Sequence, residues 1–290
     1  GSGFVIDLAG LVFWNGVGKK AEMKNKVNLS VNGGKPLKKS IQKTTETRFP
    51  NSKYGSYRNY YQSRNSRSHS KNKNHDEQPI RDKRMNLFNK SWFCGKSVLD
   101  IGCNDGQLSF DIIREYEPKE FVGVDLDPIL IRTARRTLAE MHRSIQTSDS
   151  NLKLKTKASF RLENVTESEN NPKSILNLRQ FDVILCLNIT KWIHLNYGDS
   201  VLLKFFKNIH SALNPNGILI IEPQQWSSYK RACQQHSELK SNFNAIQLNP
   251  STFPSILTSQ FGFNHLKILH SPHQNSNTPY NRPMFSLSKP

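Results

Sequence analysis

The residues best suited to chemistry lie around two short apolar runs near the middle of the sequence. A glycine-rich stretch, Asp100-Ile-Gly102-Cys-Asn104-Asp-Gly106, follows the first run. Glycines at such a place make a tight turn and let the backbone approach a ligand at the carboxyl ends of parallel strands. Asp125 ends the second run about 20 residues later, where a carboxylate can accept hydrogen bonds from both hydroxyls of a ribose. Together these features predict a binding site for a nucleoside-containing cofactor.

The composition of the turn distinguishes between two such cofactors. It has the spacing G-x-x-x-G rather than the G-x-G-x-x-G that dinucleotides prefer, and Asp100 and Asp105 stand beside its glycines. Carboxylates are unfavourable next to a pyrophosphate and favourable next to a sulfonium and an amino group. The turn therefore favours S-adenosylmethionine, with S-adenosylhomocysteine as product, over NAD. Alternatively, the two aspartates merely cap the helix that follows.

Three other segments interleave aromatic rings with cations, a combination that can stack on bases and hold phosphates. The segments are Tyr54–Arg64, Leu187–Asn196 and Glu222–Arg231. Individually, their residues have simpler explanations: Trp192 and Trp226 could fill a core, His194 could be a satisfied core histidine, and Tyr60 and Tyr61 could form one face of a helix. The segment after the fourth strand lacks the Asn/Asp-Pro-Pro-aromatic signature of amino-methyltransferases, and Cys186, inside that strand, is unsuited to attack the methyl group.

Strand and helix periodicities alternate after Arg84. This alternation predicts a Rossmann-like α/β fold, a seven-stranded, mostly parallel sheet with helices on both faces. Strands are expected at 97–101, 121–125, 158–162, 181–187, 218–222, 263–269 and 283–287. Helices are expected at 108–116, 129–141, 201–213 and 253–261, and Asn214–Gly217 is expected to form a turn.

The positive charge is concentrated before this region. The chain has a formal net charge of +18, and residues 1–84 hold 18 Lys/Arg against 6 Asp/Glu. This excess indicates a polyanionic partner or a membrane surface, or else a simply solvated arm. We expect 1–45 to be a disordered basic arm, with Gly1-Ser2-Gly3 typical of a residual tag, and 46–290 to form one domain. Flexible insertions are expected near 65–78, 143–157 and 166–180.

The cysteines and the apolar runs exclude several classes of protein. The four cysteines have no C-x-x-C spacing, which argues against a zinc site and a disulfide framework and suits a reducing compartment. No apolar run reaches the roughly 20 residues of a membrane span. Phe4–Trp14 is short and contains Asp7, so we expect neither a signal peptide nor an anchor there. No metal and no membrane are expected.

Several motifs resemble those of a known family. Val98–Gly106, Val124–Asp127 and Asn214–Gly217 resemble motifs of the class I S-adenosylmethionine-dependent methyltransferases. Tyr54-Gly-x-Tyr-x-x-Tyr-Tyr-x-x-Arg64, the Lys-Trp-Ile-His-Leu-Asn string that ends at Asn196, and Glu222-Pro-Gln-x-Trp-x-Ser-Tyr229 resemble the bicoid-interacting family of RNA methyltransferases. The resemblance covers about Phe49 to Leu287. It departs from the family at Gln225, where proline is expected, and in a polar linker at 66–77 and a short insertion after the second helix.

The resemblance implies roles for individual residues. Those implied to bind the cofactor are Arg64, Asp100, Gly102, Asn104, Gly106, Asp125, Leu126, Asn164, Val165 and Leu187. Within this set, Asp125 would take the ribose, Leu126 the adenine and Arg64 the carboxylate of the methionine part. Those implied to bind substrate are Tyr54, Tyr57, Arg58, Lys191, Trp192, His194, Gln224, Trp226, Tyr229 and Arg282. Lys191 and His194 would be the catalytic pair.

The implied reaction is methylation of the γ-phosphate of a 5′-triphosphate guanosine on a small noncoding RNA, of the 7SK or U6 type. The resemblance therefore also implies that the protein is a nuclear enzyme and that it can stay bound to its RNA within a ribonucleoprotein. Three alternatives stay open: methylation of a 5′-monophosphate, a noncatalytic RNA-binding cap, and a small-molecule methyltransferase with an unrelated basic tail. The last would place Lys191 and Trp192 in a closed apolar pocket.

Overall fold

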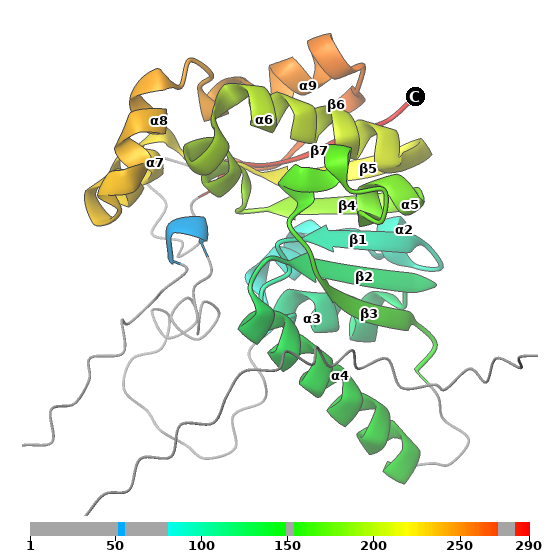
Figure 1. Ribbon diagram of the computed structural model, residues 1–290. Helices are drawn as coiled ribbons and strands as arrows, with labels where there is room; N and C mark the ends of the chain where they lie inside the picture. The colour runs from blue at the N-terminus through cyan, green and yellow to red at the C-terminus, as the bar shows by residue number, and fades with distance from the viewer. Residues whose placement is uncertain (1–51, 56–80, 149–153, 272–281) are drawn as a thin grey trace, which may run out of the picture. The chain divides into compact units, whose positions relative to one another are not determined.

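A computed structural model describes residues 52–55, 81–148, 154–271 and 282–290 (Figure 1). The chain divides into two units, Gly1–Glu46 and Thr47–Pro290, and everything described belongs to the second. The expected basic arm and the expected insertion at 65–78 lie outside the described residues.

One seven-stranded sheet organises the described part of the chain, in the order β3-β2-β1-β4-β5-β7-β6. The first five strands are parallel, and β7 runs antiparallel to both β5 and β6. This order confirms the predicted fold class. Strands β2 and β3 lie on one side of β1 and β4 and β5 on the other, so the strand order reverses between β1 and β4 and creates a switch point at their carboxyl ends. The strands are β1 (Ser97–Ile101), β2 (Glu120–Asp125), β3 (Lys157–Leu162), β4 (Phe181–Leu187), β5 (Leu213–Glu222), β6 (Asn264–His270) and β7 (Met284–Ser288).

Helices cover both faces of the sheet, as predicted. One face packs against α5 (Ile175–Leu178), α6 (Thr190–Ala212) and α9 (Phe253–Phe261), whose buried residues include Phe206, Phe253 and Leu257. The other packs against η3 (Lys83–Leu87), α2 (Lys90–Phe93), α3 (Gln107–Tyr116) and α4 (Pro128–Ser148). With apolar side chains on both faces, the central strands are buried on both sides, as parallel strands require.

A smaller apolar cluster lies beyond the ends of β4 and β5. The first turns of α6 contribute Trp192 and Leu195, while α7 (Trp226–Gln235) and α8 (Lys240–Ala245), with the 3-10 helix η5 (Ser237–Leu239) between them, cover them. Figure 1 shows α7 and α8 grouped beside the first turns of α6. The sequence did not predict α7 or α8, because their apolar residues are few and sit among lysines, glutamines and serines. This cluster makes the segments after β4 and β5 part of the folded domain.

Helix α6 differs most from its expected form. It begins at Thr190 rather than at Val201, and it includes most of the segment after β4 that combines aromatic and cationic residues. Gly198 (φ 78°, ψ −177°) interrupts it, so its two parts meet at a kink. The early turns have no simple apolar periodicity because they bury polar residues, among them Lys191 and His194.

Three other segments also differ from expectation. The region 166–180, expected to be a flexible insertion, contains η4 (Val165–Asn170) and α5 and buries Ile175 and Leu176 in the core. Helix α4 extends to Ser148, into the insertion expected from 143. The expected turn at Asn214–Gly217 lies inside β5, where Asn216 adopts φ 60° and the pairing with β4 shifts register.

No helix among the described residues is long and apolar enough to cross a membrane. The same residues contain no group of three or more His, Cys, Asp or Glu side chains placed to hold a metal ion. All four cysteines are free thiols.

The packing of α9 against α6 generates a prediction about stability. Phe253 is fully buried, with its ring centroid 5.5 Å from that of Phe206 and 5.8 Å from that of His194. Phe253→Ala should lower the free energy of unfolding by about 3–5 kcal/mol, because it leaves a cavity in the core. Urea denaturation followed by circular dichroism measures this.

Leu178→Ala is the matched control, since Leu178 is 54% exposed and its truncation should change stability by about 0.5 kcal/mol or less. Equal losses in the two variants would contradict the described packing of α9.

Candidate active site

A cavity of about 900 Å³, open solvent at its mouth included, lies where β1, β2 and β4 end. Ligands of open α/β sheets bind at this edge, outside the carboxyl ends of the strands. Ten residues proposed from the sequence line it: Tyr54, Asp100, Gly102, Asn104, Asp125, Leu126, Asn164, Val165, Leu187 and Trp192. The carboxyl ends of the strands therefore bring together residues that are far apart in the sequence.

The glycine-rich loop is held against the end of β2 by its backbone. The amides of Gly102 and Cys103 donate to the carbonyl of Val124 at 2.8 and 3.0 Å, and the amide of Asn104 donates to Asp125 Oδ2 at 3.0 Å. Gly102 has φ 77°, and a Cβ there would lie 2.2 Å from Cγ2 of Ile189. Glycine is thus required at this position both by the backbone conformation and by the narrow space beside the cavity wall.

Two carboxylates give the cavity its negative charge. Burial raises the pKa of Asp100 to about 6, against the effects of a hydrogen bond from Ser109 Oγ (2.8 Å) and of the nearby charge of Arg84. Asp125 is partly exposed by its surface area yet closely surrounded by protein, and desolvation raises its pKa to about 6 as well, although the amides of Asp127 and Asn104 donate to it. Each carboxylate oxygen of Asp125 keeps a second lone pair that can accept a ligand hydroxyl.

The residues present fit S-adenosylmethionine. Asp125 presents acceptors for a ribose diol, Asp100 supplies negative charge for an ammonium or a sulfonium, and Leu126 and Val165 provide apolar surface for a base. Gly102 lets the loop pass directly against Ile189, so both residues can line the same cavity. We therefore take this cavity as the cofactor site.

A short segment from before the sheet closes one wall of the cavity. The 3-10 helix η1 (Ser52–Tyr54) lies on the first turns of α6, where Asn196 Nδ2 donates to the carbonyl of Lys53 at 2.8 Å. A Cβ on Gly55 (φ 81°) would lie 2.2 Å from Nε1 of Trp192, so the two pack in direct contact. Tyr54 and Trp192 thereby line the same wall.

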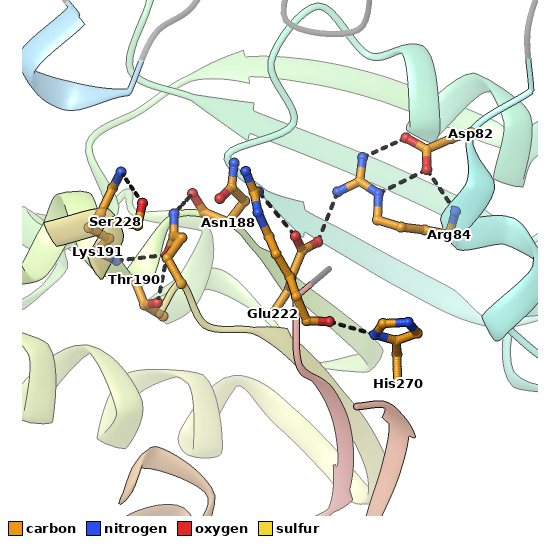
Figure 2. Close-up of polar contacts among 10 residues, drawn as sticks. Asp82, Arg84, Asn188, Thr190, Lys191, Glu222, Ser228 and His270 are labelled. Carbon is orange, nitrogen blue, oxygen red and sulfur yellow. Dashed lines mark hydrogen bonds and ion pairs between the residues drawn. The ribbon is translucent and has the colours of Figure 1, made fainter. Parts of the chain in front are cut away.

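Lys191 lies directly behind this wall. Its Nζ is 3.9 Å from the ring centroid of Trp192 and donates to Ser228 Oγ at 3.0 Å (Figure 2). Burial, together with the charges of Arg282 and Arg231, lowers the pKa of Lys191 to about 7. Lys191 is thus a buried cation beside the cavity, and the more exposed Arg282 and Arg231 lie near enough to act on its charge, an arrangement suited to an anion.

His194 occupies a different position from the one the sequence suggested. It is fully buried and is not among the described lining residues of the cavity. Its Nε2 is 2.5 Å from Asp199 Oδ1, and its Nδ1 is 3.2 Å from the hydroxyl of Tyr229, which is also fully buried. Asp199 can only accept, so Nε2 carries the hydrogen and Nδ1 accepts from the tyrosine. The structure thus gives His194 the arrangement of a satisfied core histidine, which was the simpler alternative.

Three further proposed residues support the cavity from outside its wall. Gln224 Oε1 accepts from the Lys191 amide at 3.2 Å, and its Nε2 donates to the Asn188 carbonyl at 2.5 Å, so it holds the turn between β4 and α6. Trp226 stacks between Tyr229 and Phe243 at centroid distances of 5.2 and 5.0 Å. The third residue, Gly106, has φ 85° and is the N-cap of α3, behind the glycine-rich loop.

The structure also places residues in or beside the cavity that the sequence reasoning missed. Arg84, Asn188, Ile189 and Tyr197 line it, and Glu222 lies beside it, fully buried. Glu222 could have been found, since it is an acid that ends an apolar strand at the ligand-binding edge. Arg84 precedes the first strand and carries no comparable signal. Tyr57, Arg58 and Arg64 lie outside the described residues.

Comparison with known proteins gives two matching family models. Residues 181–289 match the model described as Bicoid-interacting protein 3 (Bin3), and residues 99–219 match a methyltransferase domain. The two together span residues 99–289, which include all the lining residues of the cavity except Tyr54, Gly55 and Arg84.

Curated relatives agree with these matches. The chain is 34% identical over 243 residues to the U6 snRNA methylphosphate capping enzyme Amus of Drosophila melanogaster, covering 82% of this chain and 75% of that protein. It is 30% identical over 282 residues to the human 7SK snRNA methylphosphate capping enzyme, covering 81% of this chain but only 39% of that protein's length. The human RNA 5′-monophosphate methyltransferase is 26% identical over 188 residues, with 57% and 59% of the two chains covered.

The contact between Gly102 and Ile189 predicts the effect of a single methyl group. Gly102→Ala should weaken S-adenosylhomocysteine binding by more than about tenfold, because the Cβ displaces Ile189 and the loop that faces the ligand. Isothermal titration calorimetry measures this. Gly262→Ala is the matched control: Gly262 has φ 74°, but a methyl group added there would meet no atom within 4 Å, so it adds the same backbone strain without the clash.

The two carboxylates predict how binding depends on pH. The ligand's hydroxyls and ammonium favour ionised Asp100 and Asp125, so affinity for S-adenosylhomocysteine should weaken as the pH falls through about 6. Below that pH, each carboxylate contributes up to about a tenfold loss per pH unit. Asp125→Asn should bind at least tenfold more weakly at pH 7.5 and show a shallower pH dependence. An unchanged pH profile in this variant would remove Asp125 from the ligand contacts.

Proposed function

Because this chain belongs to the Bicoid-interacting protein 3 family of methyltransferases, we propose that it methylates the γ-phosphate of a 5′-triphosphate guanosine on a small noncoding RNA. It is an RNA methyltransferase that uses S-adenosylmethionine and acts at the RNA 5′ end. The observation that carries the proposal for a terminal phosphate is the group of cations, Lys191, Arg231 and Arg282, next to the wall of the cofactor cavity.

In this proposal the cavity binds the cofactor in one orientation. Asp125 accepts the ribose hydroxyls, Leu126 and Val165 contact the adenine, and Asn164 lies near it. Gly102, Asn104 and Asp100 face the methionine part, with Leu187 below it, and Gly106 fixes the start of α3 behind the loop. Arg64 is proposed to meet the methionine carboxylate.

When bound, S-adenosylmethionine supplies an electrophilic methyl group on its sulfonium. The acceptor needs little activation, because a terminal phosphate has a second pKa of about 6 and its oxygen is already anionic near neutral pH. The task of the protein is therefore to align the phosphate oxygen with the methyl carbon, and positioning of this kind can supply roughly 7–11 kcal/mol. Lys191 and Arg282, with Arg58, are proposed to hold the triphosphate.

The remaining substrate residues divide between contact and support. Tyr54 and Trp192 offer rings on which the first guanine can stack, and Tyr57 extends this surface in the proposal. His194 and Tyr229 act through their mutual hydrogen bond, which joins α6 to α7. Gln224 and Trp226 fix the backbone that carries Lys191. We thus propose Lys191 as the catalytic residue that touches the phosphate and His194 as a positioning residue.

Relatives suggest which RNA and which compartment to test. The names of the fly and human relatives give U6 and 7SK small nuclear RNAs as their substrates, so we propose a nuclear small RNA, held within a ribonucleoprotein, as the partner of this chain. A 5′-monophosphate is the second candidate, since other relatives are named for it.

The RNA end is tested with one sequence in three forms, carrying a 5′-triphosphate, a 5′-monophosphate or a 5′-hydroxyl. Transfer of labelled methyl groups should be fastest to the triphosphate and undetectable to the hydroxyl, because only a terminal phosphate provides the anionic acceptor. Preference for the monophosphate would select the second candidate. Equal labelling of the hydroxyl-ended RNA would show that the methyl group goes to a base or a ribose instead.

Lys191→Ala tests the proposed phosphate contact. Loss of a charged hydrogen bond should remove about 1.5–3 kcal/mol of transition-state binding, so kcat/KM should fall by about 10- to 100-fold while cofactor affinity stays within about twofold. Phosphate favours the protonated lysine, so wild-type affinity for triphosphate RNA should weaken as the pH rises above about 7, and the variant should lose this dependence. Lys207→Ala, an exposed lysine on α6, is the control. An equal loss in both variants would contradict the assignment.

A further inference from the structure

Glu222 is a buried carboxylate that contacts neither the cofactor nor the RNA in the proposed reaction. It is the last residue of β5, follows Ile220 and Ile221, and is fully buried. A carboxylate removed from water in this way costs several kcal/mol unless cations and hydrogen bonds compensate it. Its neighbours must therefore supply positive charge.

Two arginines from distant parts of the chain supply that charge. Arg84 Nη1 donates to Glu222 Oε2 at 3.4 Å, and Arg282 Nη1 donates to Glu222 Oε1 at 3.2 Å. Arg84 belongs to η3, which precedes the sheet, and Arg282 lies two residues before the start of β7. Each oxygen of the carboxylate thus holds a different segment, as the central part of Figure 2 shows for Arg84.

The two arginines face different parts of the site. Arg84 lines the cofactor cavity, is 2% exposed, and also binds Asp82 through two hydrogen bonds of 3.0 and 2.7 Å. Arg282 has a side chain that is 35% exposed, and its charge acts on Lys191. Its carbonyl oxygen is 2.8 Å from His270 Nδ1, which anchors its backbone to β6.

We propose that Glu222 is a positioning residue, which fixes Arg282 relative to Arg84 so that the phosphate-binding cations stand at a set distance from the cofactor cavity. The inference rests on the proposed function and deepens it, because it explains how the cofactor side and the acceptor side are held in one geometry. An arginine at the edge of β7 could otherwise sample many rotamers, and fixing it beforehand lowers the entropy lost when phosphate binds.

A double-mutant cycle tests this role by direct binding. Glu222→Gln should weaken binding of a 5′-triphosphate RNA by about tenfold, and Arg282→Gln should do the same. Because Glu222 is proposed to act through Arg282, the double variant should bind triphosphate RNA no more weakly than whichever single variant has the lower affinity. Binding of the same RNA with a 5′-hydroxyl should change by less than about twofold in all three variants. Fluorescence anisotropy at one fixed salt concentration measures these affinities.

Several controls separate positioning from a general loss of structure. Glu120→Gln removes a comparable carboxylate, paired with Arg179 at 2.7 Å at the start of β2, and should leave both RNA affinities unchanged. Thermal unfolding and S-adenosylhomocysteine affinity report on the fold. If Glu222→Gln does not fold, the Arg282→Gln variant can still contradict the proposal, because Arg84 continues to compensate the charge of Glu222 in that variant. Wild-type affinity of Arg282→Gln for triphosphate RNA would overturn the proposal.

Other outcomes also have definite meanings. Additive losses in the double variant, or an equal loss for triphosphate and hydroxyl RNA, would show that Glu222 does not act through Arg282 and would overturn the inference. A wild-type protein that binds both RNA ends equally would instead refute the proposed terminal-phosphate function. The two failures are therefore distinguishable in the same experiment.

Discussion

At the carboxyl ends of β1, β2 and β5 the protein encloses the carboxylates of Asp100, Asp125 and Glu222, each of which would be costly without a partner. Asp100 accepts a hydrogen bond from the hydroxyl of Ser109. Asp125 accepts from the amide of Asn104 in the glycine-rich loop and from that of Asp127, and Glu222 accepts from two guanidinium groups. Satisfying these groups fixes the loops that follow the strands. The requirement to pair enclosed charge thus shapes the edge of the sheet at which we propose that the reaction takes place.

The sheet and its two apolar cores make such pairing precise. Strands β1, β4 and β5 are covered on both faces, so their ends have little freedom, and the turns that leave them inherit that rigidity. The cofactor side depends mainly on backbone contacts, with the amides of Gly102 and Cys103 bound to the Val124 carbonyl. The acceptor side depends more on side chains, with Gln224 holding the turn after β4. Side-chain substitutions should therefore alter the acceptor side more readily than they alter the conformation of the cofactor loop.

The third apolar cluster links the acceptor side to the fold. It packs α7 against the first turns of α6, and the buried bond between His194 and Tyr229 joins the same two helices. Lys191 lies between Trp192 and Ser228, one from each of these helices. Its lowered pKa follows from this enclosure and from neighbouring arginines. An anion that binds here would contact a cation that is already desolvated, and the low local dielectric constant strengthens the attraction between the two charges.

The sequence by itself determined the sheet, the glycine-rich loop and the position of Asp125 at the end of β2, because these depend on periodicity and on residues that are close along the chain. It also indicated the segments after β4 and β5, through a local density of aromatic and cationic residues. It could not tell which side chain of such a segment faces the cavity. Trp192 lines it, Lys191 lies behind it and His194 is buried away from it, since helical geometry at α6 separates neighbours by about 100°. The ion network of Glu222 was likewise decided only by tertiary structure, because Arg84, Glu222 and Arg282 meet only when η3, β5 and the start of β7 pack together.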